Sequence, residues 1–178
     1  MRTPARAAHL LGGAALLCLP ALVAAQQKQP LIYDAAAAQT RTVHDQRMAV
    51  DDVPDHLLRF YDVRRSFTGR APVFDGVRAI EMWEQGVADT VDRNGSESAY
   101  ITYVLENGDK VLGRYAGVVQ SFRWPDGSRH YDHVGTITLT GGSGRFAAVR
   151  GLIRVRAAVD PGADSNQIES KGEYWLLR

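Results

Sequence analysis

Two turn sequences in the middle of the chain constrain its fold more than any other feature. Asn107-Gly108 follows residues 98–105 (SAYITYVL), a run rich in β-branched and aromatic residues. The PDGS sequence at 125–128 separates a second such run, 110–124, from a third, 129–140. Asn-Gly and Asp-Gly between apolar runs are typical of two-residue hairpin loops, whose central positions favour positive φ. The sequence therefore predicts three consecutive antiparallel strands.

The rest of the chain beyond residue 50 has the same β pattern. Further candidate strands lie at 53–67, 73–83, 87–91, 151–160 and 168–177, with turn residues between them. Pro54 favours an edge position for the first, and Gly76 is a candidate bulge. No segment predicts a long helix, so we expect roughly seven to nine strands in a closed barrel or a sandwich.

The N-terminus has the composition of an export signal. Arg2 and Arg6 precede an apolar run at 10–19, and Val-Ala-Ala at 23–25 is a small-residue cleavage region. The run is short for a membrane anchor, which is the alternative. We expect a signal peptide at 1–25, a flexible arm at 26–49 (or a short helix near 35–38), and a barrel domain at 50–178. The mature protein would be periplasmic or secreted, with no membrane contact after cleavage.

Composition excludes several kinds of site in the mature chain. Cys18, the single cysteine, lies within the signal, and bulky Leu17 before it argues against a lipid anchor. Disulfides, thiolate metal sites and a cysteine nucleophile are therefore not expected. The chain has 21 Lys and Arg against 20 Asp and Glu, and loss of the signal leaves it near neutral. Nucleic acid is thus a poor candidate partner.

The two hairpins predict which face of the sheet is inside. With two-residue loops, Leu105 pairs with Lys110 and Phe122 with Tyr131, and directly opposed residues share a face. One face is then clearly more apolar, and we assign it to the interior; a slip of one residue would invert a strand. This predicted interior carries Ile101, Tyr103, Leu105, Leu112, Ala116, Val118, Phe122, Tyr131, Ile137 and Leu139.

Polar residues also fall on this predicted interior face. Arg114, Gln120 and His133 lie there beside the two tyrosines, and a buried Arg114 would need a carboxylate such as Glu173, or a wet mouth. The functional interpretation is a ligand cavity with apolar walls and a few convergent polar groups. The alternative is a filled core in which these groups are satisfied locally.

Other motifs are weak. His130 and His133 are three apart, so on a strand they point to opposite faces, and no metal site is expected. No nucleophile-elbow or Walker sequence is present. The glycine-rich stretch 135–151 (GTITLTGGSGRFAAVRG) precedes no helix that could bind an anion. We expect its glycines to bend a hairpin, with Phe146 plugging one end.

This stretch resembles the Gly-Gly-Thr/Ser-Gly-x-Phe-x-x-Ala-x-Gly pattern of dirigent proteins and the related allene oxide cyclase-like barrels. It departs from the pattern at Val149, where Ala is usual. ENGDKVLGRYAG at 106–117 and SKGEYWL at 170–176 are similar to segments of bacterial exported members of that superfamily. The resemblance implies a single antiparallel eight-stranded barrel with a largely apolar cavity, cofactor-free chemistry, and homodimers or homotrimers.

These observations lead to three hypotheses. The first is a cofactor-independent isomerase, cyclase or lyase, decarboxylases included, for a small apolar or aromatic substrate; Tyr103, Tyr131 or His133 would act as acid or base and Arg114 would hold an anion. The second is a non-catalytic carrier or sensor of a hydrophobic small molecule. The third is a structural module packed solid. The expected ligand-binding residues are Ile101, Leu112, Gln120, Phe122 and Glu173.

Overall fold

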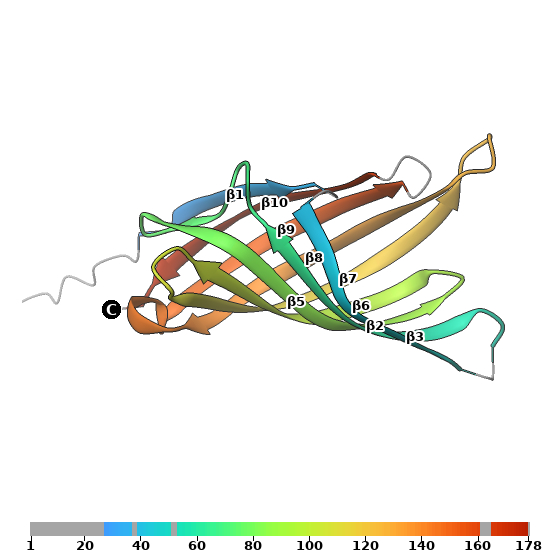
Figure 1. Ribbon diagram of the computed structural model, residues 1–178, viewed down its shortest axis with the longest axis horizontal. Coiled ribbons are helices and arrows are strands. Elements are labelled where there is room, and N and C mark those ends of the chain that lie inside the picture. Colours follow the sequence, from blue (N-terminus) through green and yellow to red (C-terminus); the bar gives the residue numbers. More distant parts are fainter. Residues whose placement is uncertain (1–26, 37–38, 51–52, 161–164, 178) are drawn as a thin grey trace, which may run out of the picture.

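Strands make up most of the computed structural model, which describes residues 27–36, 39–50, 53–160 and 165–177 (Figure 1). The described residues include no α-helix, and none belongs to a helix long and apolar enough to span a membrane. The elements are β1 (Gln29–Ala35), β2 (Thr40–Ala49), β3 (His56–Ser66), β4 (Val73–Phe74), β5 (Val77–Val91), β6 (Asn94–Leu105), β7 (Lys110–Arg123), β8 (Arg129–Gly142), the 3₁₀ turn η2 (Gly144–Phe146), β9 (Val149–Asp160) and β10 (Ser165–Leu176).

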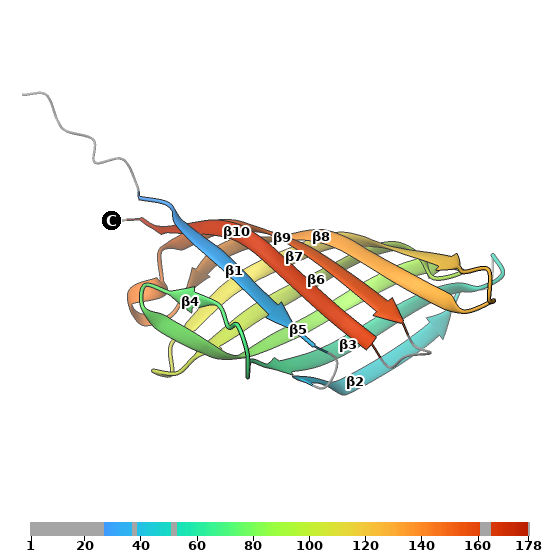
Figure 2. The ribbon, with the colours of Figure 1, turned by 90° about the horizontal axis from the view of Figure 1, so that it is seen from above.

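The strands form one antiparallel sheet that curls around an interior (Figures 1 and 2). Its order is β1-β10-β9-β8-β7-β6-β5-β3-β2, and β4 pairs with β5. The prediction of an all-β antiparallel fold is confirmed. The prediction of a closed eight-stranded barrel is wrong, because the sheet has ten strands and no pairing joins its edge strands β1 and β2 among the described residues.

The segment 26–49 contributes both edges of the sheet. β1 pairs along the full length of its seven residues with β10 and buries Leu31, Tyr33 and Ala35 on one face. β2 pairs with β3, although most of its side chains are exposed. The prediction of a flexible arm is therefore wrong for these strands, whose weak periodicity hid them. The predicted signal peptide at 1–25 and half of the alternative helix at 35–38 lie outside the described residues.

The two central hairpins have loops one residue longer than predicted. In the first, Leu105 N–H donates to Asp109 O at 2.9 Å, and Gly108 has φ of 85°. In the second, Trp124 N–H donates to Ser128 O at 3.0 Å, and Gly127 has φ of 86°. A three-residue loop that ends in a left-handed glycine is the next most common hairpin after the two-residue kind. Each loop shifts the pairing by one residue.

This shift turns β7 over relative to the sequence-based assignment. Val111, Tyr115 and Val119 are buried, whereas Leu112 and Val118 are 40% and 48% exposed. The first shift turns β7 over relative to β6, and the second turns β8 over relative to β7. The inward faces of β6 and β8 therefore match the prediction. Confirmed interior residues are Ile101, Tyr103, Leu105, Tyr131, Ile137 and Leu139; residues wrongly assigned to the interior are Leu112, Arg114, Ala116, Val118, Gln120 and Phe122.

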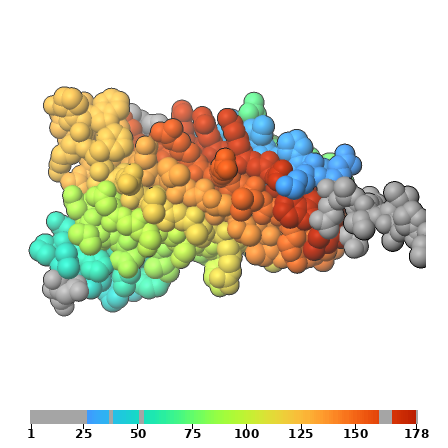
Figure 3. Space-filling view, turned by 180° about the vertical axis from the view of Figure 1, so that it is seen from behind, coloured from blue at the N-terminus to red at the C-terminus, as the bar shows by residue number. Residues whose placement is uncertain are grey.

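One end of the curled sheet is plugged by aromatic side chains. Phe146 in η2 and Phe74 in β4 are fully buried, with ring centroids 6.5 Å apart. Phe74 also contacts Tyr103 and Tyr174, at 5.4 and 5.2 Å between centroids. The expected roles of the glycine-rich bend and of Phe146 as a plug are confirmed. At the opposite end the β2–β3 and β7–β8 hairpins project from the body (Figure 3).

Candidate functional site

The interior of the sheet holds a cavity of about 250 Å³ above the aromatic plug. A second hollow of about 270 Å³ continues toward the hairpin end, and Arg59, Glu97, His133 and Val159 line both. Since alternate residues of each strand face inward, the wall combines side chains from strands that are distant in sequence. Its apolar part includes Val63, Met82, Ile101, Ile137, Val155, Ala157 and Ile168.

A pair of glycines makes room for one wall of the cavity. Gly117 and Gly135 face each other across β7 and β8. A Cβ at Gly117 would lie 2.2 Å from the Tyr115 hydroxyl, and one at Gly135 would lie 2.3 Å from the Tyr115 ring. The ring therefore packs over both backbones. Burial, and then the charge of Glu97, raises the pKa of Tyr115, so its hydroxyl keeps its proton at neutral pH.

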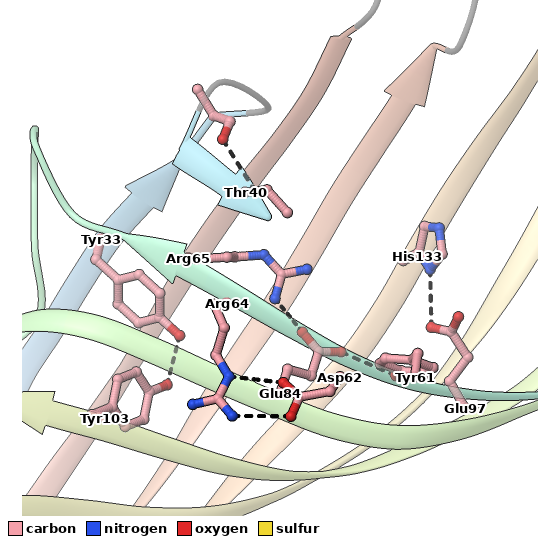
Figure 4. A network of polar contacts seen from close by, with 11 residues as sticks. Tyr33, Thr40, Tyr61, Asp62, Arg64, Arg65, Glu84, Glu97, Tyr103 and His133 are labelled. Carbon is pink, nitrogen blue, oxygen red and sulfur yellow. Dashed lines mark hydrogen bonds and ion pairs between the residues drawn. The ribbon is translucent and has the colours of Figure 1, made fainter. Parts of the chain in front are cut away.

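His133 and Glu97 form an acid–base pair inside the cavity (Figure 4). Nδ1 of His133 lies 2.9 Å from Oε2 of Glu97, whose side chain is 9% exposed. A carboxylate can only accept here, which assigns the shared proton to Nδ1 and leaves Nε2 of the neutral ring as the basic nitrogen. Among the described residues, Nε2 has no hydrogen-bond partner. The pair thus presents a positioned base to the cavity.

Arg65, Glu84 and Tyr61 form a second polar cluster on β3 and β5 (Figure 4). Nη1 of Arg65 donates to Oε2 of Glu84, and the Tyr61 hydroxyl donates to Oε1 at 3.1 Å. The Arg65 and Glu84 side chains are only 10% and 15% exposed. Burial raises the pKa of Tyr61, and the carboxylates of Glu84 and Glu97 add to that shift. Tyr61 therefore stays protonated and acts as a donor.

Two buried tyrosines meet at the bottom of the cavity. The hydroxyls of Tyr33 and Tyr103 are 2.7 Å apart (Figure 4). Burial raises the pKa of both, and that of Tyr103 rises well above its usual range. Tyr33 lines the cavity, whereas Tyr103 lies behind it against Phe74. This geometry disfavours Tyr103 as a base.

Charged side chains surround the hairpin end of the interior. Asp45 accepts hydrogen bonds from Nη2 of Arg59 at 2.9 Å and from Nη2 of Arg47 at 3.2 Å. The Arg59 hydrogen bond is the main cause that lowers the pKa of Asp45 to about 2. Arg93 donates to the Tyr131 hydroxyl at 2.8 Å and lies over its ring. The arginines that face this hollow are thus held by acidic or aromatic partners.

Several predicted site residues lie outside the cavity. Arg114 is on the outer face of β7, where Nη2 donates to the Tyr100 hydroxyl at 2.9 Å. Glu173 forms an ion pair with Lys28, and its side chain is 45% exposed. The prediction that these two residues and Leu112, Gln120 and Phe122 lie inside was therefore wrong. For the four residues of β7 (Arg114 among them) the cause is the shifted register. Glu173 points outward because its neighbour Tyr174 points inward, and adjacent residues of a strand face opposite sides.

Four predicted site residues do lie on the inner face. Ile101 and His133 line the first cavity, and Tyr131 and His133 line the second. Tyr103 is interior but set back from the wall. Their catalytic or binding roles stay predictions.

The sequence interpretation missed Tyr61, Arg65, Glu84 and Glu97. In β3 only positions 61, 63 and 65 are buried between less buried neighbours, and the inward residues Tyr61, Val63 and Arg65 do not differ in polarity as a set from the outward ones, so the period-2 signal of this strand was weak. Glu84 and Glu97 gave no signal of this kind. Glu84 lies just beyond the predicted strand 73–83 and Glu97 just before the predicted strand 98–105, and a carboxylate that faces inward is unusual unless it is paired.

His130 lies on the opposite side of β8 from His133. It stacks against Trp124 with centroids 4.2 Å apart, and its Nε2 is 2.9 Å from Ser128 Oγ. Across residues 27–36, 39–50, 53–160 and 165–177, no group of three or more His, Cys, Asp or Glu side chains is arranged to hold a metal ion.

Comparison with known proteins found no matching family model, no matching curated protein and no matching solved structure. The resemblance to dirigent and allene oxide cyclase-like proteins therefore stays a prediction, which rests on the glycine-rich motif. Any functional argument must come from the chemistry of the cavity itself.

Proposed function

We propose that the protein is a cofactor-independent isomerase, cyclase or lyase that acts on a small apolar or aromatic molecule in its interior cavity. The observation that carries the proposal is the His133–Glu97 pair, with Nε2 of His133 unpartnered among the described residues. Acid–base groups of this kind contribute about 10²–10⁴-fold to a reaction when they are held within reach of the substrate.

The proposed chemistry follows from the roles of the individual groups. Glu97 holds the ring of His133 and stabilises the imidazolium that forms when Nε2 takes a proton from the substrate. In an isomerisation the same nitrogen returns that proton at another atom, so the step is balanced without a further reagent. Tyr115, which keeps its proton, is available to donate a hydrogen bond to a developing oxyanion. The apolar wall supplies orientation and excludes water.

The test is turnover of a panel of small aromatic compounds, followed by mass spectrometry. His133→Gln and Glu97→Gln should each reduce the rate, the former by about a hundredfold or more. His44→Gln and Glu169→Gln are matched controls, because both residues are exposed on the surface. Equal rates in His133→Gln and wild type would contradict the proposal.

A carrier or sensor of a hydrophobic molecule is the second candidate. The pairing of the inward charges favours this function, because Arg65 binds Glu84 and Glu97 binds His133. Among the described residues of the cavity, these pairs leave Nε2 of His133 as the one base without a partner. A ligand that co-purifies unchanged, with no product on prolonged incubation, would support it over catalysis. A solid structural module is disfavoured, because a cavity of about 250 Å³ is much larger than a few water molecules need.

We also propose that the protein is exported to the periplasm or the medium, on the strength of residues 1–25, and that it forms a dimer or trimer. Intact mass of the protein from the periplasmic fraction tests the first, and light scattering tests the second.

A further inference from the structure

Two buried polar side-chain atoms in the described residues have no hydrogen-bond partner, and both residues line the same cavity. They are Nε of Arg65 on β3 and Oγ of Ser170 on β10. Arg65 is 8% exposed and Ser170 is 1% exposed. Unpaired buried polar groups are rare in folded proteins because they lose their hydrogen bonds to water. Burial raises the pKa of Tyr33, but Ser170 lies close enough to the Tyr33 hydroxyl to lower it, so Nε of Arg65 is the main indication of a ligand that supplies acceptor atoms.

The unused part of Arg65 has a definite shape. Only Nη1 reaches Glu84, which meets one end of the guanidinium (Figure 4). Nε and Nη2 form the other edge, and neither donates to any described residue. Two parallel N–H groups on one edge of a guanidinium match the two oxygens of a carboxylate.

The charges around the cavity disfavour an anion of more than one charge. Its charged lining consists of Arg59 and Arg65 against Glu84 and Glu97, which balance. One carboxylate therefore adds a single negative charge beside Arg65. A phosphate dianion would place two charges next to Glu84, at a larger cost in a poorly hydrated interior.

We propose that the Nε–Nη2 edge of Arg65 binds the carboxylate of a small apolar or aromatic acid, with the Ser170 hydroxyl as an additional donor. This inference rests on the proposed function, because it assigns the substrate class of the same cavity. The apolar body of the acid lies against Ile137 and Val155, and His133 lies farther along the cavity from Arg65 (Figure 4). The substrate is then held at one end and exposed to the base at the other.

The test compares 3-phenylpropanoate with 3-phenylpropanol, which has the same body and no charge. We expect the wild-type protein to bind the acid about tenfold to a hundredfold more tightly, as charge-assisted hydrogen bonds should. The Arg65 Nε–H resonance should move on addition of the acid and not of the alcohol. Arg65→Lys keeps the charge beside Glu84 but lacks the fork, and should lose most of the preference.

Controls separate binding from folding. Arg154→Lys changes an exposed arginine on the outer face of β9 and should leave both affinities unchanged. If Arg65→Lys does not fold, the double variant Arg65→Met/Glu84→Gln removes both charges together and should bind the alcohol with no preference for the acid. Ser170→Ala should weaken the acid severalfold and leave the alcohol unaffected.

The outcomes distinguish this inference from the proposed function. If the wild type binds both probes equally, or if Arg65→Lys retains the preference, the carboxylate site is overturned while the cavity remains a binding site. If neither probe perturbs the methyl resonances of the cavity wall, both the carboxylate site and the proposed function are overturned.

Discussion

The register of β7 can be tested by one substitution made at two positions of the same strand. Val111 is fully buried and Val118 is 48% exposed. Valine to alanine removes about two methylene equivalents, worth about 0.8 kcal/mol each, and a cavity adds to that loss at a closely packed site. We expect Val111→Ala to reduce the free energy of unfolding by about 2–3 kcal/mol.

Val118→Ala is the matched control for this effect. It loses the same β-branched side chain from the same strand, so both variants share the loss of strand propensity, which is at most about 1 kcal/mol. Urea unfolding followed by tryptophan fluorescence gives both values. The difference between them should be at least about 1.5 kcal/mol. A larger loss for Val118→Ala would restore the register that two-residue loops predict, and equal losses would contradict the register described here.

Three further predictions concern the interior and its rim. Arg65→Met and Glu84→Gln should each cost about 3–5 kcal/mol in urea unfolding, because each leaves a buried charge unpaired, whereas the double variant should cost far less. Asp45→Asn should cost about 1 kcal/mol at pH 7, after allowance for solvent screening. The pKa of Asp45 is about 2 in the folded protein and ordinarily near 4. The difference in unfolding free energy between wild type and Asp45→Asn should therefore be present above about pH 4 and vanish as the pH falls through 2. Unfolding measured at several pH values checks this, and a difference that does not change with pH would contradict it. Phe146→Ala should cost about 3–5 kcal/mol by opening the plugged end, and a melting temperature unchanged from wild type would exclude the plug.

The sequence predicted the strands of the centre well and their pairing less well. Residues 98–105 and 129–140 carry enough β-branched and aromatic residues to identify strand and face together. The sequence pattern did not determine the length of the hairpin loop. Asn107-Gly108 suits a two-residue loop, and its glycine also suits the left-handed position that ends a three-residue loop. One extra loop residue was enough to move Arg114 from the predicted interior to the surface.

The site was predicted only in part for a related reason. His133 was found because its strand was assigned correctly. Its partner Glu97 comes from a part of β6 that precedes the strongly apolar run, and Arg65 and Glu84 meet only because β3 pairs with β5. Such contacts depend on the register between strands distant in sequence, which composition and periodicity do not specify.

Methyl NMR with a neutral aromatic probe is the most direct test of whether small molecules bind inside the curved sheet. The inner face presents Ile101, Ile137 and Val155 to the cavity, and the outer face presents exposed Leu152 and Val134. On titration with 3-phenylpropanol, we expect saturable shifts at the three inner residues and none at the two outer ones. Shifts confined to the outer face, or no saturable shift at all, would contradict binding inside the sheet.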